Sequence, residues 1–235
     1  MGIFGRWLGG SLGWVLGGPI GGLMGMLAGS MSDDEEYAGT STARGDFGIS
    51  LLILIAAVMK ADGPVVKSEL DYVKHFIVRQ FGRESAKEAL LTLKDIISKD
   101  IPAREVCVQI SNNMDYSSRL QLLHLLFNVS ISDTNIHPAE LELIEKMSRA
   151  MGIRVTDFQS LKNMFIPETD SSYKILEIDT SFTNDQVKKA YRKMAMKYHP
   201  DKVAHLGESF KKTADEKFKK VNEAYERIKK ERNMA

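Results

Sequence analysis

Cysteine is nearly absent from this sequence, because Cys107 is the only one among 235 residues. One cysteine can form neither a disulfide framework nor a cysteine-based zinc cluster, so a reducing compartment is the default expectation. Net charge is also nearly absent, since 32 basic and 31 acidic residues leave +1. That balance gives no reason to expect the whole chain to bind nucleic acid. P-loop, HExxH, GxSxG and paired-cysteine motifs are missing as well, so we expect no enzyme activity.

Charged side chains are missing from Trp7 to Met31, a run of 25 residues that is long enough to cross a bilayer. Eleven of the 18 glycines lie in residues 1–31. Their neighbours are mostly apolar, unlike the Ser and Gln that accompany glycine in flexible linkers. Seven of these glycines recur at every fourth residue, at Gly5, Gly9, Gly13, Gly17, Gly21, Gly25 and Gly29. On a helix they form a ridge without side chains against which a second helix can pack in lipid, which predicts a self-associating membrane segment.

Two other interpretations of residues 1–31 stay open: a disordered glycine-rich leader, or a secretory signal with Ala28 and Ser30 at its cleavage site. The orientation is open too. Arg6 before the segment and the acidic run 33–36 after it favour a cytoplasmic N-terminus and an exported remainder. Pro19 would instead permit a shallow hairpin that leaves both ends on one side of the membrane.

Strand-like alternation is lacking in the rest of the chain, where the apolar residues follow a helical spacing. An apolar content of 43% also argues against global disorder. We therefore predict an all-α fold with a linker at 32–46, a helical bundle at 47–166, a second linker at 167–172 and a further domain at 173–235. The helices predicted for the bundle are 47–61, 67–81, 84–98, 103–112, 117–131, 138–151 and 156–165.

The predicted bundle contains an internal repeat at an offset of 71 residues. The segment that begins at Leu51 aligns with the one that begins at Leu122, and each reads as an apolar helix, an acidic turn and a second helix. Two such helix pairs can bury their apolar faces in one bundle. The repeat resembles the TerB-like tellurite-resistance domain, which implies a seven-helix fold. It also implies a divalent-cation site formed by the acidic turn residues Asp62, Glu69, Asp133 and Glu140.

A second interpretation of these four acidic residues stays open beside the metal site. Asp62 and Asp133 can satisfy backbone groups of a turn. Glu69 and Glu140 fall in the first turn of a predicted helix, where the helix dipole favours negative charge. Neither turn is an EF-hand, since the twelfth position counted from Asp133 is Ile144.

The C-terminal domain is predicted to contain a helical hairpin. Thr183 and Gln186 form a capping box that starts a helix, and this helix ends at about Tyr198 because Pro200 stops it. A second capping box, Thr213 with Glu216, predicts that the final helix starts there, after an exposed loop over 199–212. Apolar residues at helical spacing should pack the two helices against each other. The first helix also carries a row of cations, Lys188, Lys189, Arg192, Lys193 and Lys197.

The triplet His199, Pro200 and Asp201 lies between these two helices, within the sequence KYHPDK. Its position resembles that in a J-domain, the module by which DnaJ-type co-chaperones engage a DnaK-type chaperone. The resemblance implies that the triplet triggers ATP hydrolysis in the partner and that the basic row docks on an acidic patch of that partner. One departure is Glu177, since the family usually has glycine at this position.

The order of parts resembles the DjlA type of membrane-anchored DnaJ-like proteins. It implies a co-chaperone, anchored in a bacterial inner membrane with its J-domain facing the cytoplasm, that stimulates a DnaK-type ATPase. The alternative is a divalent-metal-binding scaffold or sensor in envelope stress, with an auxiliary J-domain. Nucleic acid is not an expected partner, because ten acidic residues are interspersed in 173–235 and no aromatic residue interrupts the basic row as a stacking platform.

Overall fold

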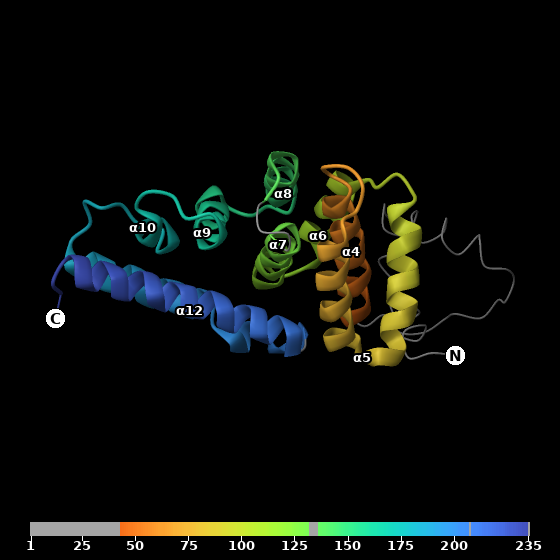
Figure 1. Cartoon of the computed structure of the whole chain (residues 1–235). Coiled ribbons are helices and arrows are strands. Elements are labelled where there is room, and N and C mark those ends of the chain that lie inside the picture. The colour runs from red at the N-terminus through yellow and green to blue at the C-terminus, as the bar shows by residue number, and fades with distance from the viewer. Residues whose placement is uncertain (1–42, 132–135, 207, 235) are drawn as a thin grey trace, which may run out of the picture. The chain divides into compact units, whose positions relative to one another are not determined.

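The computed structural model describes residues 43–131, 136–206 and 208–234. Within these ranges the chain forms helices and no strand, which confirms the all-α prediction. Figure 1 shows the helices in chain order, from α4 in orange to α12 in blue. The predicted membrane segment and most of the first linker lie outside the described residues.

The chain divides into two compact units. Unit 1 comprises the residues up to Met114 together with Asn128–Gly152, and unit 2 comprises Asp115–Phe127 together with Ile153–Ala235. Helix α7 (Tyr116–Ser130) contributes residues to both units. The units group residues by packing, and they differ in extent from the domains predicted at 47–166 and 173–235. The bounds 47–166 and 173–235 therefore stay predictions.

Unit 1 is built around an apolar helix, α4 (Ala43–Met59). Every side chain from Leu51 to Met59 is buried, so this helix is covered on all sides. It packs against α5 (Lys67–Ile97), α6 (Ala103–Asn113) and α8 (Pro138–Ala150). The helices predicted from apolar spacing are thus present, and their ends differ by a few residues.

Helix α5 contains the break that the sequence predicts between 67–81 and 84–98. Gly82 has non-helical backbone there, with φ 78° and ψ 167°. Positive φ is accessible to glycine at little cost because glycine has no Cβ. The chain therefore turns at Gly82, and Figure 1 shows the two parts of α5 running in different directions from this bend.

Unit 2 contains α9 (Val155–Phe165), α10 (Ser171–Ile175), α11 (Asn184–Lys197), the 3₁₀ segment η1 (Pro200–Leu206) and α12 (Glu208–Glu231). The predicted capping box starts α11: the Thr183 N–H donates to Gln186 Oε1 at 2.8 Å, and the Gln186 N–H donates to Thr183 Oγ1 at 3.4 Å. Helices α11 and α12 pack together, with the Tyr191 and Tyr225 rings stacked at 4.2 Å. The predicted hairpin is therefore present.

The predicted start of the final helix was wrong. Helix α12 begins at Glu208, so Thr213 lies inside it and is 6% exposed. Phe210 is fully buried and extends the apolar face of α12 toward its N-terminus. Burial of this phenylalanine outweighs the local capping pattern, since an aromatic side chain removes far more apolar area from water than a cap contributes. The predicted exposed loop is likewise structured, because Val203 and Leu206 of η1 are buried.

Candidate functional site

The His199-Pro200-Asp201 triplet follows α11 and includes the first two residues of η1. Helix α11 ends with the Tyr198 N–H donating to Met194 O at 3.0 Å, and Pro200 then begins η1. The side chains of His199 and Asp201 are 50% and 83% exposed. The triplet can therefore be reached by a partner protein.

Local contacts fix the orientation of the His199 ring. The Asp201 N–H donates to His199 Nδ1 at 3.3 Å, and Asp201 Oδ2 lies 3.5 Å from the same nitrogen. Both contacts are made by Asp201, one through its N–H and one through its carboxylate, so the turn holds the ring through Nδ1. The ring also meets the Phe218 ring of α12 edge-on, with centroids 6.0 Å apart. A defined turn thus presents one imidazole ring and one carboxylate.

The basic row of α11 is only partly exposed. Lys189, Arg192 and Lys193 are exposed, and Lys188 is half-buried. Lys197, the member of this row nearest to the triplet, has a side chain only 12% exposed. The exposed positive surface next to the triplet is therefore smaller than the five cations of the sequence suggest.

Lys197 is held by two buried carboxylates. Its Nζ donates to Asp157 of α9, which is 0% exposed, and to Glu177, which is 6% exposed. Asp157 also accepts from Arg154 Nε at 2.9 Å and from the hydroxyl of Tyr116 on α7. Glu177 has φ 58°, a left-handed conformation that a residue with a Cβ seldom adopts.

Burial and charge act in opposite directions on this cluster. Burial raises the pKa of Glu177 and lowers the pKa of Lys197, because each charged form loses hydration. The contact between the ammonium and two carboxylates favours the charged forms. We assign the ionised state at neutral pH, since breaking a buried pair into one uncompensated charge is the costlier alternative.

A second lysine lies inside unit 2. Lys217 of α12 is 0% exposed, and its Nζ has no hydrogen-bond partner among the described residues. It lies 5.1 Å from the centroid of the Tyr198 ring. Burial lowers the pKa of Lys217 well below its usual value, and the charge of Lys197 lowers it further.

Sequence reasoning missed Asp157 and Lys217, and it noticed Glu177 only as a departure from the J-domain pattern. The burial of Lys217 can be recognised from helical spacing once α12 is known to start at Glu208. The position falls in the series of buried residues at helical spacing, which are Phe210, Ala214, Lys217, Val221, Ala224 and Ile228. Asp157 carries no comparable signal, since it is an acidic residue in the first turn of a helix, where acidic residues are common.

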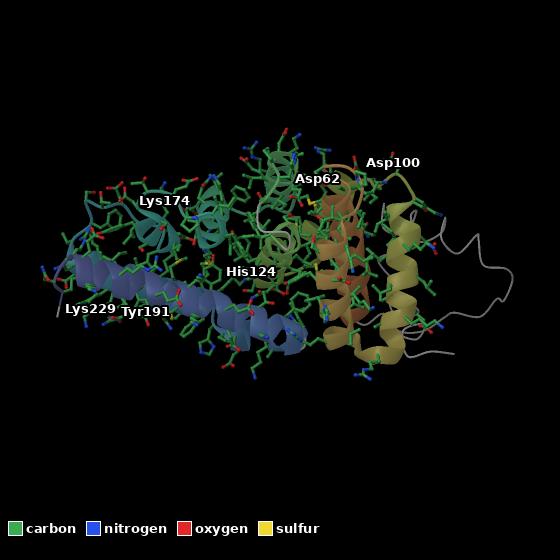
Figure 2. All side chains as sticks on the ribbon, in the orientation of Figure 1. Asp62, Asp100, His124, Lys174, Tyr191 and Lys229 are labelled. Atoms are coloured by element: carbon green, nitrogen blue, oxygen red, sulfur yellow. The ribbon has the colours of Figure 1, made fainter. Side chains whose placement is uncertain are left out.

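The predicted metal residues are not brought together as a set in the described part of the chain. Asp62 is exposed in the turn after α4 (Figure 2). Glu69 Oε2 accepts from the Val66 N–H at 3.2 Å, and Glu140 Oε2 accepts from the His137 N–H at 2.8 Å. Both glutamates thus cap the start of their own helices. Asp133 lies outside the described residues.

Within the described ranges, no group of three or more His, Cys, Asp or Glu side chains could hold a metal ion. Metal binding therefore stays a prediction. The predicted glycine ridge, from Gly5 to Gly29, also lies outside the described residues. Among the helices that are described, none combines the length and the apolar character needed to cross a membrane.

Three family models match successive parts of the chain. The tellurite resistance protein TerB model matches residues 48–163, the DnaJ domain model matches 171–234, and the co-chaperone DjlA transmembrane domain model matches 1–45. The last match supports association with a membrane. The second implies a partner of the DnaK class.

Two curated relatives match very different shares of the chain. The co-chaperone protein DjlA of Vibrio vulnificus is 27% identical over 80% of this chain and 79% of its own length. The chaperone protein DnaJ of Fusobacterium nucleatum is 57% identical over 54 residues, which are 23% of this chain and 14% of that protein. The chain thus spans only a small part of the DnaJ relatives, in their J-domain.

No solved structure matches the chain significantly. The matched models nevertheless follow one another along nearly the whole sequence, in the order found by sequence analysis. This chain therefore has the three-part architecture of the DjlA type of DnaJ-like co-chaperones.

Proposed function

We propose that this protein is a membrane-anchored co-chaperone whose J-domain binds a DnaK-type chaperone and stimulates its ATP hydrolysis. The observation that carries the proposal is the exposed His-Pro-Asp turn at the end of a helix with exposed cations. The family-model matches and the DjlA relative support a co-chaperone role. ATP chemistry belongs to the partner.

The proposed action divides into steering and triggering. Lys189, Arg192 and Lys193 are exposed cations that would steer the J-domain toward an acidic patch of the partner and fix its orientation. The triplet would then contact the conformation of the partner that hydrolyses ATP. Binding this conformation in preference to others shifts the partner's population toward it. A rigid turn reduces the ordering cost of that contact.

The proposed location is a bacterial inner membrane, with the J-domain in the cytoplasm. Support comes from the match of residues 1–45 to the DjlA transmembrane domain model. A tether would raise the effective concentration of the recruited chaperone at the membrane surface. The orientation is tested by protease treatment of intact cells and of spheroplasts, in which cleavage of an external J-domain would contradict the proposal.

The function is tested with the full chain reconstituted in lipid vesicles and a purified DnaK-type chaperone. We expect the chain to accelerate single-turnover ATP hydrolysis, and His199→Gln to abolish the acceleration while circular dichroism stays unchanged. His75→Gln is a matched control, because His75 is an exposed histidine of α5 in unit 1. A His199→Gln variant as active as the unmodified chain would contradict the proposal.

A further inference from the structure

Lys197, two positions before the triplet, is held by two buried carboxylates, and one of them, Asp157, comes from outside the J-domain match. Asp157 lies in the part matched by the TerB model, whereas Lys197 and Glu177 lie in the part matched by the DnaJ model. All three belong to unit 2, so this contact is formed within one compact unit. Residues of the TerB-like part therefore contact the J-domain two positions before His199.

A second contact lies on the other side of the triplet. His205 of η1 has its Nε2 3.5 Å from Ser118 Oγ and 3.7 Å from Asp115 Oδ2, at the start of α7. Asp115 and Ser118 also lie in the part matched by the TerB model. The triplet is thus flanked by two contacts with TerB-like residues, yet its own His199 and Asp201 side chains stay exposed.

The conformation of Glu177 gives independent support. At φ 58° glycine is the favoured residue, because a Cβ approaches the backbone too closely in this left-handed conformation. This chain nevertheless has glutamate there, and the carboxylate contacts Lys197 and lies 3.6 Å from Lys193. Backbone strain at this position is therefore coupled to a charge contact with α11.

From these contacts we infer that Asp157 and Glu177 are positioning residues for the His199-Pro200-Asp201 triplet. They hold Lys197, and α9 of the TerB-like part thereby fixes the end of α11 from which the triplet projects. Lys197 is a structural tie in this arrangement, and docking is left to the exposed cations of α11. The inference rests on the proposed function, since it assigns a role in presenting the triplet to the ATPase.

An alternative role for α9 is to mask the triplet from a partner, but the exposed fractions of the His199 and Asp201 side chains argue against it. A masking contact would cover the triplet, but Asp201 is 83% exposed and His199 50%. The cation that is covered, Lys197, is held by two buried carboxylates, and breaking such a contact leaves an uncompensated buried charge. A partner would gain little by competing for Lys197.

The test uses the full chain in vesicles and measures two quantities: the plateau of ATPase stimulation at saturating co-chaperone, and the concentration that gives half of it. Asp157→Asn should lower the plateau by about threefold to tenfold. A variant that merely folds less well would shift the half-saturating concentration and keep the plateau. Lys189→Ala, at a docking position, should raise the half-saturating concentration with a smaller effect on the plateau.

Two further variants separate positioning from loss of folding. Glu177→Gly is compatible with the left-handed backbone and removes one of the two carboxylates, so it should fold normally and lower the plateau partially. Glu168→Gln is the matched control. Glu168 ties Lys162 of α9 to Lys174 of α10 at 2.7 and 2.9 Å and is not one of the carboxylates that hold Lys197, so its loss should leave the plateau unchanged.

A readout without the partner keeps this inference separate from the proposed function. Amide hydrogen exchange over residues 199–206 should be faster in Asp157→Asn than in the unmodified chain, and unchanged in Glu168→Gln. If the unmodified chain does not stimulate the ATPase, the proposed function fails. If it does, a plateau that is unchanged or raised in Asp157→Asn, or unchanged exchange over 199–206, overturns the positioning role.

Discussion

Lys217 lies on the buried face of α12, where most of its neighbours are apolar. Its side-chain nitrogen is fully buried, has no hydrogen-bond partner among the described residues, and lies 5.1 Å from the centroid of the Tyr198 ring. A buried amino group without hydrogen bonds loses its hydration, and because burial lowers its pKa well below the usual value, folding also favours loss of its proton. Lys217 therefore acts against the stability of unit 2.

Replacing Lys217 by methionine should stabilise the protein. Methionine has a similar length and no charge, so Lys217→Met should raise the free energy of unfolding by about 1–3 kcal/mol in denaturant titrations at pH 7. Lys219→Met, at an exposed position of the same helix, should change it by less than about 0.5 kcal/mol. A lower free energy of unfolding for Lys217→Met would mean that the ammonium makes a favourable interaction in the folded state.

His124 makes the stability of unit 2 depend on pH. Burial lowers its pKa well below the usual value, and the charge of Lys217 lowers it further. The folded state thus keeps the ring neutral, next to the Phe165 ring at 4.8 Å, whereas the unfolded state binds a proton below about pH 6.5. The contribution of His124 is fully present above that pH and is lost as the pH falls.

The free energy of unfolding should consequently decrease by up to about 1.4 kcal/mol per pH unit below pH 6.5 because of this residue. Denaturant titrations at pH 7.5 and pH 5.5 measure the decrease. His124→Gln should weaken the dependence, and His75→Gln, which alters an exposed histidine, should retain it. Equal pH dependence in the chain with and without His124 would contradict this explanation.

At the scale of elements, the two glutamates of the internal repeat act as caps. Glu69 and Glu140 each accept the N–H of the residue that precedes their helix. Each satisfies a backbone donor that the helix itself leaves unpaired. The sequence placed both glutamates in a first helical turn, where the helix dipole favours negative charge, and the structure adds a capping hydrogen bond to each.

Substitution by alanine and by glutamine should separate capping from metal binding. Glu140→Ala should lower the free energy of unfolding by about 1 kcal/mol or more, whereas Glu140→Gln should cost less because an amide oxygen can also accept the cap bond. Calorimetry with calcium, magnesium and zinc should then detect no binding that depends on Glu69 or Glu140. Binding that disappears in Glu69→Gln would instead support the predicted metal site.

Most helices were predictable from local pattern, and one helix start was not. The apolar spacing of α4, α6 and α8 and the capping box of α11 reflect interactions within a few residues, which a sequence shows directly. The start of α12 depends on the burial of Phe210, which is a property of the folded protein. The capping pattern at Thr213 could not predict the start at Glu208, because tertiary packing decides where this helix begins.

At the scale of the whole molecule, the spacing of the N-terminal glycines predicts self-association in the membrane. Gly21 lies on the ridge of every fourth residue, and Gly22 lies beside it. A side chain at a ridge position would hold two helices apart, because close approach depends on the missing Cβ. Gly21→Ile should therefore reduce cross-linked dimers of the full chain in vesicles.

Gly22→Ile is the matched control, since it adds the same side chain one position away from the ridge. Dimers should persist in that variant. Equal cross-linking of both variants would show that the glycine ridge does not mediate self-association.

The order of modules, the helical class, the J-domain triplet and the caps of the first turns follow from the sequence by itself. Each depends on residues that are close in the chain, so hydrophobic periodicity, motif spacing and capping residues can be identified directly in the sequence. The placement of Lys197 between Asp157 and Glu177, and of Lys217 inside unit 2, was decided only by the tertiary structure. A charged residue has the same local pattern whether it faces water or a distant carboxylate, so only long-range packing could distinguish a docking cation from a structural tie.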